Sequence, residues 1–417
     1  MHHTCRISAV LLVSLVMLCL TLPAGATVWN VSNMSGLNSA MASLQNGDEV
    51  VLSPGTYDLR QGHSYYISQS NVTIRGSTAN FSDVTLYGGG MNNTGAVAEC
   101  LGLAGDNIAV KDLTISGFFH HAVHFQPGAD NSVIQNIRTL NIGEQHMKGA
   151  VPNVGGLIAN CLMEQTEAWQ QLTRPNDYVG GIDLHGAVNF EIRNNVAKNI
   201  KGSNGGGDAA YFLWNDSKNC ILEGNVAIGC SKGISLGNPG GQGQGYNCED
   251  TIVRNNFIVP ANNNDIGMEF CFTKNCEVYN NTVYRIAGPN DPDFFRTLQI
   301  FDTSALKTVN LQLTNNLIYG NTNIVATGTY TLTNNIIGTG PQASWFVDPA
   351  AGDLHLTALA TAAINHGLVL SDVLDDFDGQ SRGGSPDIGA DEIVPEPATL
   401  AMLAAGGLAL LRRKTAR

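Results

Sequence analysis

The stretch Gly181–Asn195 reads GIDLHGAVNFEIRNN, and variants of it recur along the chain. Short apolar runs alternate with Gly and Asn, and the final Asn hardly changes between copies. Successive copies lie 24, 35, 30, 31, 25, 35 and 19 residues apart. Such intervals indicate one structural unit per copy, with loop insertions in the longer ones. The copies end at Asn136, Asn160, Asn195, Asn225, Asn256, Asn281, Asn316 and Asn335.

One copy holds only a few strands of three to five residues, so it cannot bury its apolar face alone. Stacking successive copies makes a continuous core. We therefore predict an all-β fold, a single right-handed parallel β-helix over residues 48–340. The Asn column is expected to be structural, because Asn tolerates the left-handed backbone of a bend. Asn amides stacked about 4.8 Å apart can also hydrogen-bond along the ladder.

Residues 27–47 are predicted to form an N-terminal cap. Leu37, Ala40, Met41 and Leu44 follow the spacing of a helical stripe. A short amphipathic helix at this place would cover the first coil and prevent pairing at its open edge.

GDEVVLSPGTYDL (47–59), NVTIRG (71–76) and the recurring Asn pairs resemble the pectate-lyase-like right-handed β-helix family. Further on, FVDPAAGDLHL (346–356) and DDFDGQSRGGSPDIGADE (375–392) resemble the choice-of-anchor Q module. The second resemblance implies that residues 341–394 form a closing module between the β-helix and a surface-sorting tail.

Residues 1–26 have the form of a secretory signal peptide. Basic residues near the start precede an apolar run over 9–22, and Ala24-Gly25-Ala26 offers a cleavage site of small residues. We therefore expect an exported protein.

The segment 395–417 has the form of a sorting tail. Pro395-Glu396-Pro397 precedes an apolar run over 398–411 and then Arg412-Arg413-Lys414. The run is shorter than the roughly 20 residues that span a bilayer. The segment resembles the PEP-CTERM signal, which implies an exosortase-type sorting protease as a partner and transient membrane contact. The expected location is the cell surface or extracellular matrix of a Gram-negative-type bacterium. A plain membrane anchor is the alternative.

The formal net charge is −13. Without the two end segments, 17 basic and 34 acidic residues remain, a charge of about −17. Such a surface repels nucleic acid and anionic lipid, so no nucleic-acid partner is expected.

Nine Cys include two in the signal peptide, and the seven that remain cannot all be paired within one chain. Cys220 and Cys276 occupy one repeat column, which suggests small buried side chains. Pairing of Cys248 with Cys271 stays open.

In GIDLH, Ile182 and Leu184 are expected to point inward, so Asp183 and His185 point outward on one face. Counting back from each Asn, with a one-residue shift at 154–156, places further residues on this face. The outward positions are His124 and Gln126, Lys148 and Ala150, Leu213 and Asn215, Ser235 and Gly237, and Glu269 and Cys271.

His124, Lys148 and Asp183 should then stack on successive strands about 4.8 Å apart. His146, two residues before Lys148, and His185 should flank this line. The candidate catalytic residues are thus His124, His146, Lys148, Asp183 and His185.

The aromatic residues Tyr211, Phe212 and Trp214 could stack on a sugar, but Phe212 and Trp214 count as inward, which favours core packing. The Gly-rich segments 203–208 and 237–245 are expected to be loops bordering the groove.

The spacing of acidic residues argues against glycoside hydrolysis. That reaction needs two carboxyl groups roughly 5–9.5 Å apart, whereas Asp183 and Glu269 are predicted about 14 Å apart, three strand spacings. Uronate β-elimination or C5 epimerisation instead needs a base beside a carboxylate and a cation to neutralise it. Lys148 would hold the carboxylate, because a neighbouring Asp183 keeps it protonated, and a His would carry the proton.

Two readings therefore remain for an exported protein engaged with extracellular polysaccharide. One is a uronate lyase or epimerase. The other is a non-catalytic surface, matrix or adhesion protein, in which outward Lys and Asp residues are only surface ion pairs worth under about 1 kcal/mol. No cofactor is assigned. Calcium is a candidate at Asp376, Asp378 and Asp387, and Asp-Gly turns explain these residues equally well.

Overall fold

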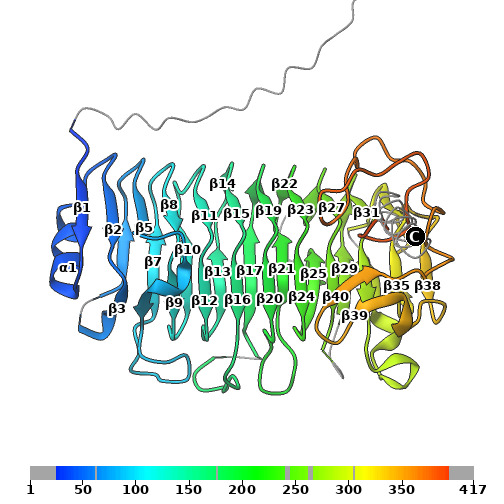
Figure 1. Ribbon diagram of the computed structural model, residues 1–417, viewed down its shortest axis with the longest axis horizontal. Helices are drawn as coiled ribbons and strands as arrows, with labels where there is room; N and C mark the ends of the chain where they lie inside the picture. Colours follow the sequence, from blue (N-terminus) through cyan, green and yellow to red (C-terminus); the bar gives the residue numbers. More distant parts are fainter. Residues whose placement is uncertain are drawn as a thin grey trace, which may run out of the picture.

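A computed structural model describes residues 25–61, 63–174, 177–239, 245–261, 266–303 and 306–393. Within them the strands stack side by side along the long axis of the molecule, with helix α1 (Met34–Ser43) at one end (Figure 1). Each coil adds one strand to each of three long parallel sheets. The predicted all-β parallel β-helix is confirmed.

The first long sheet runs β1 (Val28–Val31), β2 (Glu49–Leu52), β5 (Thr73–Gly76), β8 (Ala109–Lys111), β11 (Val133–Gln135), β15 (Leu157–Ala159), β19 (Glu191–Arg193), β23 (Ile221–Glu223), β27 (Ile252–Arg254), β31 (Glu277–Tyr279), β34 (Leu311–Thr314) and β37 (Tyr330–Thr333). The second runs β3 (Gly55–Asp58), β6 (Val84–Tyr87), β9 (Thr114–Ser116), β12 (Arg138–Leu140), β16 (Leu162–Glu164), β20 (Val196–Lys198), β24 (Val226–Ile228), β28 (Phe257–Val259), β32 (Thr282–Tyr284), β35 (Leu317–Tyr319) and β38 (Ile336–Gly338).

The third, called the ten-stranded sheet below, runs β4 (Tyr65–Ile67), β7 (Glu99–Leu103), β10 (His121–Phe125), β13 (Gln145–Gly149), β17 (Gly180–His185), β21 (Ala209–Trp214), β25 (Lys232–Leu236), β29 (Ile266–Cys271), β33 (Leu298–Phe301) and β36 (Thr322–Ile324). A short sheet of β14 (Asn153–Val154), β18 (Ala187–Val188), β22 (Ser217–Lys218), β26 (Cys248–Glu249) and β30 (Thr273–Lys274) lies between the third and the first along each of these coils. Single 3-10 turns occur at Leu59–Gln61, Phe81–Asp83, Gly288–Asn290, Phe294–Arg296 and Ala343–Trp345.

Helix α1 forms where the helical stripe predicted it. Asn33 caps it by accepting a 2.9 Å hydrogen bond from the backbone N–H of Gly36. Leu37, Ala40 and Leu44 are buried at the N-terminal end of the solenoid core. Among the described residues, no helix has the length and apolar character needed to cross a bilayer.

The two residues of each Asn pair have different tasks. The second forms a buried ladder, in which each side-chain Nδ2 donates to the Oδ1 of the next coil at 2.8–3.1 Å. The first has the left-handed backbone, with a φ of 55° at Asn194 and 54° at Asn255. The expectation that one Asn does both was therefore wrong. The ladder consists of Asn195, Asn225, Asn256, Asn281, Asn316 and Asn335.

Asn136 and Asn160 belong to the other column, since their φ values are 51° and 56°. The backbone N–H of Cys161, not of Asn160, donates to the ladder through Asn195 Oδ1. Aligning these two copies on their Asn therefore shifts them by one residue.

The C-terminal part of the described chain packs on the outside of the second sheet. The hairpin of β39 (Phe346–Asp348) and β40 (Asp353–Leu356) and the residues after it form a second apolar cluster with Phe257, Val259 and Leu317. Figure 1 shows this segment alongside the last coils. Asn side chains with left-handed backbone fasten it, by donating to backbone carbonyls of Asp375, Asp387, Leu368 and His366. The choice-of-anchor Q resemblance of this segment stays a prediction.

The seven Cys at described positions are free and buried. Cys248 and Cys271 are therefore not paired, and Cys220 and Cys276 are the small buried residues that the repeat column predicted.

Candidate functional site

The outer face of the ten-stranded sheet carries a line of titratable residues. His124 on β10 pairs in register with Lys148 on β13, and Lys148 pairs with Asp183 on β17. Their predicted stacking on successive strands is confirmed. The column continues through Phe212 on β21 and Ser235 on β25.

Lys148 and Asp183 form a buried ion pair. The Lys148 ammonium hydrogen-bonds Asp183 Oδ2, and the two side chains are 7% and 1% exposed. Burial favours the neutral amine, but the contacts with Asp183 and Tyr178 together outweigh this effect and raise the pKa of Lys148. Burial also acts to raise the pKa of Asp183, yet its contacts with His185 and Lys148 lower that pKa. Both groups are therefore ionised.

His185 completes this cluster with a defined tautomer. Its Nε2 lies 3.0 Å from the Lys148 ammonium, which can only donate, and 3.5 Å from Asp183 Oδ1, which can only accept. The shorter contact favours an accepting Nε2. A neutral imidazole then carries its proton on Nδ1, which lies 3.1 Å from the side-chain amide of Asn215. The Oδ1 of Asn215 is buried without another partner, so turning the amide lets it accept this proton. The lone pair of His185 thus points towards Lys148.

Tyr178 borders the cluster from the loop that precedes β17, and sequence counting did not find it. The Lys148 ammonium lies 5.8 Å from the centre of its ring. Burial raises the pKa of the Tyr178 hydroxyl, while the charge of Lys148 acts against that rise. The hydroxyl is protonated at neutral pH and can donate a proton. The sequence gives one hint of Tyr178, the insertion before Asp183, which makes the interval from Asn160 to Asn195 35 residues long.

The other two predicted residues, His124 and His146, contact different partners and are not part of the Lys148–Asp183–His185 cluster. His124 shares the column, but its Nδ1 lies 3.0 Å from Glu99 Oε1 on the preceding strand. His146 does not share the outer face of Lys148, and that expectation was wrong. Its side chain is fully buried, and Nδ1 lies 2.7 Å from the hydroxyl of Thr139 on β12. Burial lowers the pKa of His146 to about 3.

Phe212 and Trp214 are on the outer face, so the expectation that they point inward was wrong. Phe212 pairs with Asp183, and Trp214 pairs with His185. Their rings stack with centroids 5.1 Å apart. The Trp214 indole N–H donates to Asp183 Oδ1 at 2.9 Å.

The cause of this error is one extra residue in a turn. Gly186 alone follows His185 before β18, whereas Asn215 and Asp216 both follow Trp214 before β22. Both of these residues have left-handed backbone, with φ of 52° and 70°. Because side chains alternate along a strand, a shift of one residue exchanges the inner and outer sets.

Loop insertions lie at the N-terminal ends of β17 and β21. Two insertions, 165–179 and 199–208, precede these strands. A cleft of about 530 Å³ lies between them and is lined by Glu167, Trp169, Lys201 and Ser203, among others. The predicted Gly-rich loop 203–208 borders this cleft. The loop 237–245 lies partly outside the described residues.

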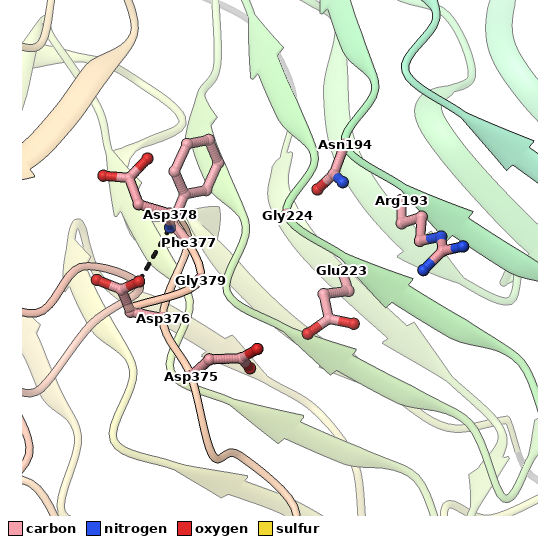
Figure 2. Close-up of a pocket in the computed structure, with 9 residues that line it drawn as sticks. All are labelled: Arg193, Asn194, Glu223, Gly224, Asp375, Asp376, Phe377, Asp378 and Gly379. Atoms are coloured by element: carbon pink, nitrogen blue, oxygen red, sulfur yellow. Dashed lines mark hydrogen bonds between the residues drawn. The ribbon is translucent and has the colours of Figure 1, made fainter. Parts of the chain in front are cut away.

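A second pocket, of about 260 Å³, lies between the coils and the C-terminal segment (Figure 2). Asp376 and Asp378, two of the three calcium candidates, line it. However, Asp376 accepts backbone N–H bonds from Asp378 and Gln380, and Asp387 accepts one from Asn365. Two of the three candidates thus cap loop backbone, as the turn explanation expected. The ligand atoms that do gather there, within 4.8 Å of one another, belong to His355, Asp378 and Asp391.

Residues 394–414 match the model of the PEP-CTERM protein-sorting motif. The chain carries a sorting signal. This motif indicates export and cell-surface sorting through an exosortase-type protease, as the tail predicted. The matched residues lie outside the described part of the structure.

Comparison with curated proteins gave no match. Several solved structures are similar. Alginate lyase from Paenibacillus sp. str. FPU-7 is 12% identical, with 75% of this chain and 99% of that chain covered and a TM-score of 0.41. Pectate lyase Pel9A is 16% identical, with 88% and 96% covered and a TM-score of 0.42. The tailspike protein of E. coli bacteriophage HK620, in complex with a pentasaccharide, is 12% identical, with 75% and 60% covered and a TM-score of 0.49. These likenesses are of fold alone.

Proposed function

We propose that this exported protein acts on an extracellular polysaccharide containing uronate residues, by abstracting the proton at C5 as a lyase or epimerase does. The observation that carries the proposal is the cluster of Lys148, Asp183, His185 and Tyr178 on the outer face of the ten-stranded sheet.

Each group suits one part of this reaction. The Lys148 cation neutralises the uronate carboxylate and so stabilises the negative charge that develops when the adjacent proton leaves. The unprotonated Nε2 of His185 takes the proton. The Tyr178 hydroxyl, held protonated by its raised pKa, returns a proton to C5 or to the departing glycosidic oxygen. Asp183 keeps Lys148 charged and receives the Trp214 indole N–H, so it acts as a positioning residue.

The alternative is a non-catalytic surface or matrix protein that only binds glycan. The burial of the Lys148–Asp183 pair favours this non-catalytic alternative, because a substrate has to pass His185 and Tyr178 to contact Lys148. The two functions differ in one measurable respect, exchange of the C5 proton with solvent.

The test is incubation of acidic and neutral polysaccharides with the protein in D2O, followed by NMR detection of deuterium at C5. An epimerase returns a deuteron to C5, whereas a lyase leaves an unsaturated uronate with no proton at C5, which ultraviolet absorbance detects. Either signal reports removal of the C5 proton, called exchange below. We expect His185→Gln and Tyr178→Phe to reduce exchange at least 100-fold while melting stays close to wild type. Lys232→Met is the matched control, since Lys232 pairs with Glu269 on the same sheet, and should retain exchange.

Lys148→Ala should also abolish exchange, but it leaves Asp183 buried and unpaired. Breaking such a pair costs about 3–5 kcal/mol, so this variant should also melt at a lower temperature than the wild type. Binding of an acidic glycan without C5 exchange in the wild-type protein would favour the non-catalytic alternative.

A further inference from the structure

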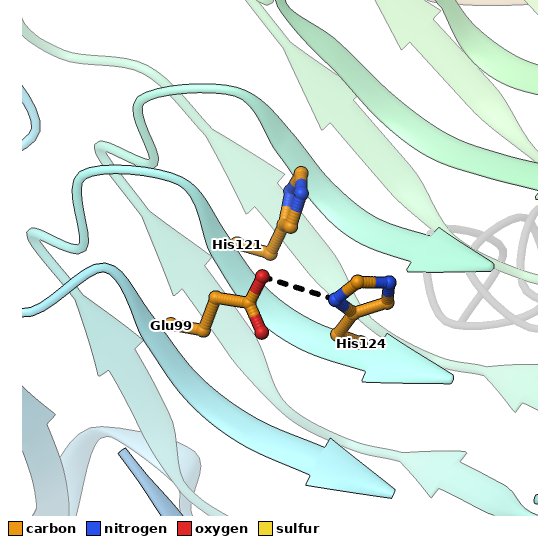
Figure 3. A group of neighbouring side chains, drawn as sticks. All are labelled: Glu99, His121 and His124. Carbon is orange, nitrogen blue, oxygen red and sulfur yellow. Dashed lines mark hydrogen bonds and ion pairs between the residues drawn. The ribbon is translucent and has the colours of Figure 1, made fainter. Parts of the chain in front are cut away.

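Three side chains on neighbouring strands converge one strand away from Lys148. Glu99 begins β7 and pairs in register with His121, which begins β10. One ligand atom from each of Glu99, His121 and His124 lies within 4.8 Å of the other two. Figure 3 shows the Glu99 carboxylate facing the His124 ring, with His121 beside them. No role in the uronate chemistry above uses Glu99 or His121.

His121 has the protonation of a metal ligand. Its Nδ1 lies 3.0 Å from the backbone carbonyl of Gln145, which can only accept, so Nδ1 carries the proton. The lone pair of the neutral ring is therefore on Nε2, and the side chain is buried. Metal-binding histidines commonly donate their other N–H to a carbonyl in this way, which fixes the ring and its tautomer.

The lone pair on His121 Nε2 faces the carboxyl group of Glu144. His121 Nε2 lies 3.6 Å from Glu144 Oε2, and both atoms are acceptors when Glu144 is ionised. The other carboxylate oxygen of Glu144 lies 3.6 Å from His120 Nε2. Glu99 adds a second carboxylate, from the residue that pairs in register with His121 on the neighbouring strand. A bound cation would satisfy both carboxylates and the imidazole together.

We propose that Glu99, His121 and His124 bind one divalent transition-metal ion of the zinc class, with Glu144 at the border of the site. Two imidazole nitrogens and one carboxylate oxygen are a ligand set that Zn²⁺ prefers, with a coordination position left open. Calcium is disfavoured because it takes oxygen ligands. The ion would add positive charge one strand spacing from Lys148, about 4.8 Å along the sheet. Its binding does not depend on the uronate chemistry proposed above.

The test is calorimetric titration of the metal-stripped protein with Zn²⁺, and absorption spectroscopy with Co²⁺. The protein is purified without a histidine tag and without the predicted signal peptide, which carries His2 and His3. We expect one ion per chain, a higher melting temperature with Zn²⁺, and Co²⁺ absorption bands typical of nitrogen and oxygen ligands. His121→Ala, His124→Ala and the conservative Glu99→Gln should each weaken binding at least tenfold.

Two controls locate the ion. His63→Ala removes an exposed imidazole outside the triad and should bind as wild type does. His355→Ala disrupts the other group of potential ligands, His355, Asp378 and Asp391, and should also bind as wild type does. Melting of each metal-free variant checks that it is folded. The proposal is overturned if the wild type binds no Zn²⁺, if Glu99→Gln and both triad His variants bind as tightly as wild type, or if binding is lost only in His355→Ala.

Discussion

Replacing Asn256 by Leu tests whether the buried Asn ladder stabilises the solenoid. Asn256 Nδ2 donates to the carbonyl of Leu222 at 3.0 Å and to Asn281 Oδ1 at 2.9 Å. Its Oδ1 accepts from the backbone N–H of Asn225 at 2.9 Å and from Asn225 Nδ2 at 3.1 Å. Leucine has a similar size and branching but makes none of these bonds.

The loss of unfolding free energy in Asn256→Leu depends on which backbone and side-chain groups lose a hydrogen-bond partner. Asn225 Nδ2 keeps a bond to the Ile192 carbonyl, and Asn281 Oδ1 keeps the backbone N–H of Asn256. The backbone N–H of Asn225 and the carbonyl of Leu222 each lose a bond inside the core, which costs about 1–3 kcal/mol per unsatisfied group. The buried leucine side chain returns about 1.5–3 kcal/mol. Taking the middle of each range, we expect the free energy of unfolding to fall by about 2 kcal/mol.

The assay is urea denaturation followed by circular dichroism and by tryptophan fluorescence, because a solenoid can unfold in parts and the two probes must agree. Asn310→Gly is the control. It removes an exposed Asn–Asn bond of 3.1 Å to Asn275 Oδ1, and glycine accepts the φ of 51° at this position. This control should change stability by less than about 0.5 kcal/mol. If the two variants have equal urea midpoints, the buried ladder does not stabilise the fold as argued.

Two further predictions concern buried titratable groups. Burial, together with the nearby charge of Asp183, raises the pKa of Asp208 to about 6. The folded state then binds more protons than the unfolded chain, so this group makes stability fall as the pH rises from about 4 to 6. Asp208→Asn should therefore gain stability relative to wild type at pH 7 compared with pH 4, measured by urea midpoints, and an equal difference at both pH values would contradict this. Burial also raises the pKa of the thiols, to about 12 for Cys161, Cys230 and Cys276, so a thiol reagent should modify none of the seven in the native protein and all seven in denaturant. Fewer than seven after denaturation would indicate a disulfide.

The fold could be predicted from the sequence because its determinants recur at short intervals. Apolar runs and Asn pairs repeat at the length of one coil, and the ladder demands the same residue at each repeat. Counting along the sequence could not assign which Asn of each pair forms the ladder and which one has the left-handed backbone. Asn194 and Asn195 look alike in the sequence, yet one has the left-handed backbone and the other lies in the ladder.

The site was predicted only in part, for reasons that lie in the turns. The register of His124, Lys148 and Asp183 came out correctly. The extra residue at Asn215–Asp216 then placed the Phe212 and Trp214 side chains on the opposite face from the one expected. His146 is the second residue of β13 and departs from the strict alternation that counting assumes, since its buried side chain contacts Thr139. Tyr178 comes from an insertion outside the repeated strands and turns, so the repeat could not place it.

The position of the Lys148–Asp183 pair argues that it serves more than the scaffold. Some ion pairs of the solenoid are partly exposed, as for Lys218 and Glu249, whose side chains are 44% and 14% accessible, whereas the Arg285–Asp291 pair is fully buried. The Lys148–Asp183 pair differs from Arg285–Asp291 in its place, because it lies on the outer face of the ten-stranded sheet beside His185 and Tyr178. A buried ion pair contributes little to stability relative to apolar packing, because removing both charges from water is costly. A coil that needed only stability would be better served by the apolar side chains used in most of the core. Extra chain, a costly charge pair, an oriented imidazole and a tyrosine occur together at one place, and this combination favours chemistry over scaffold.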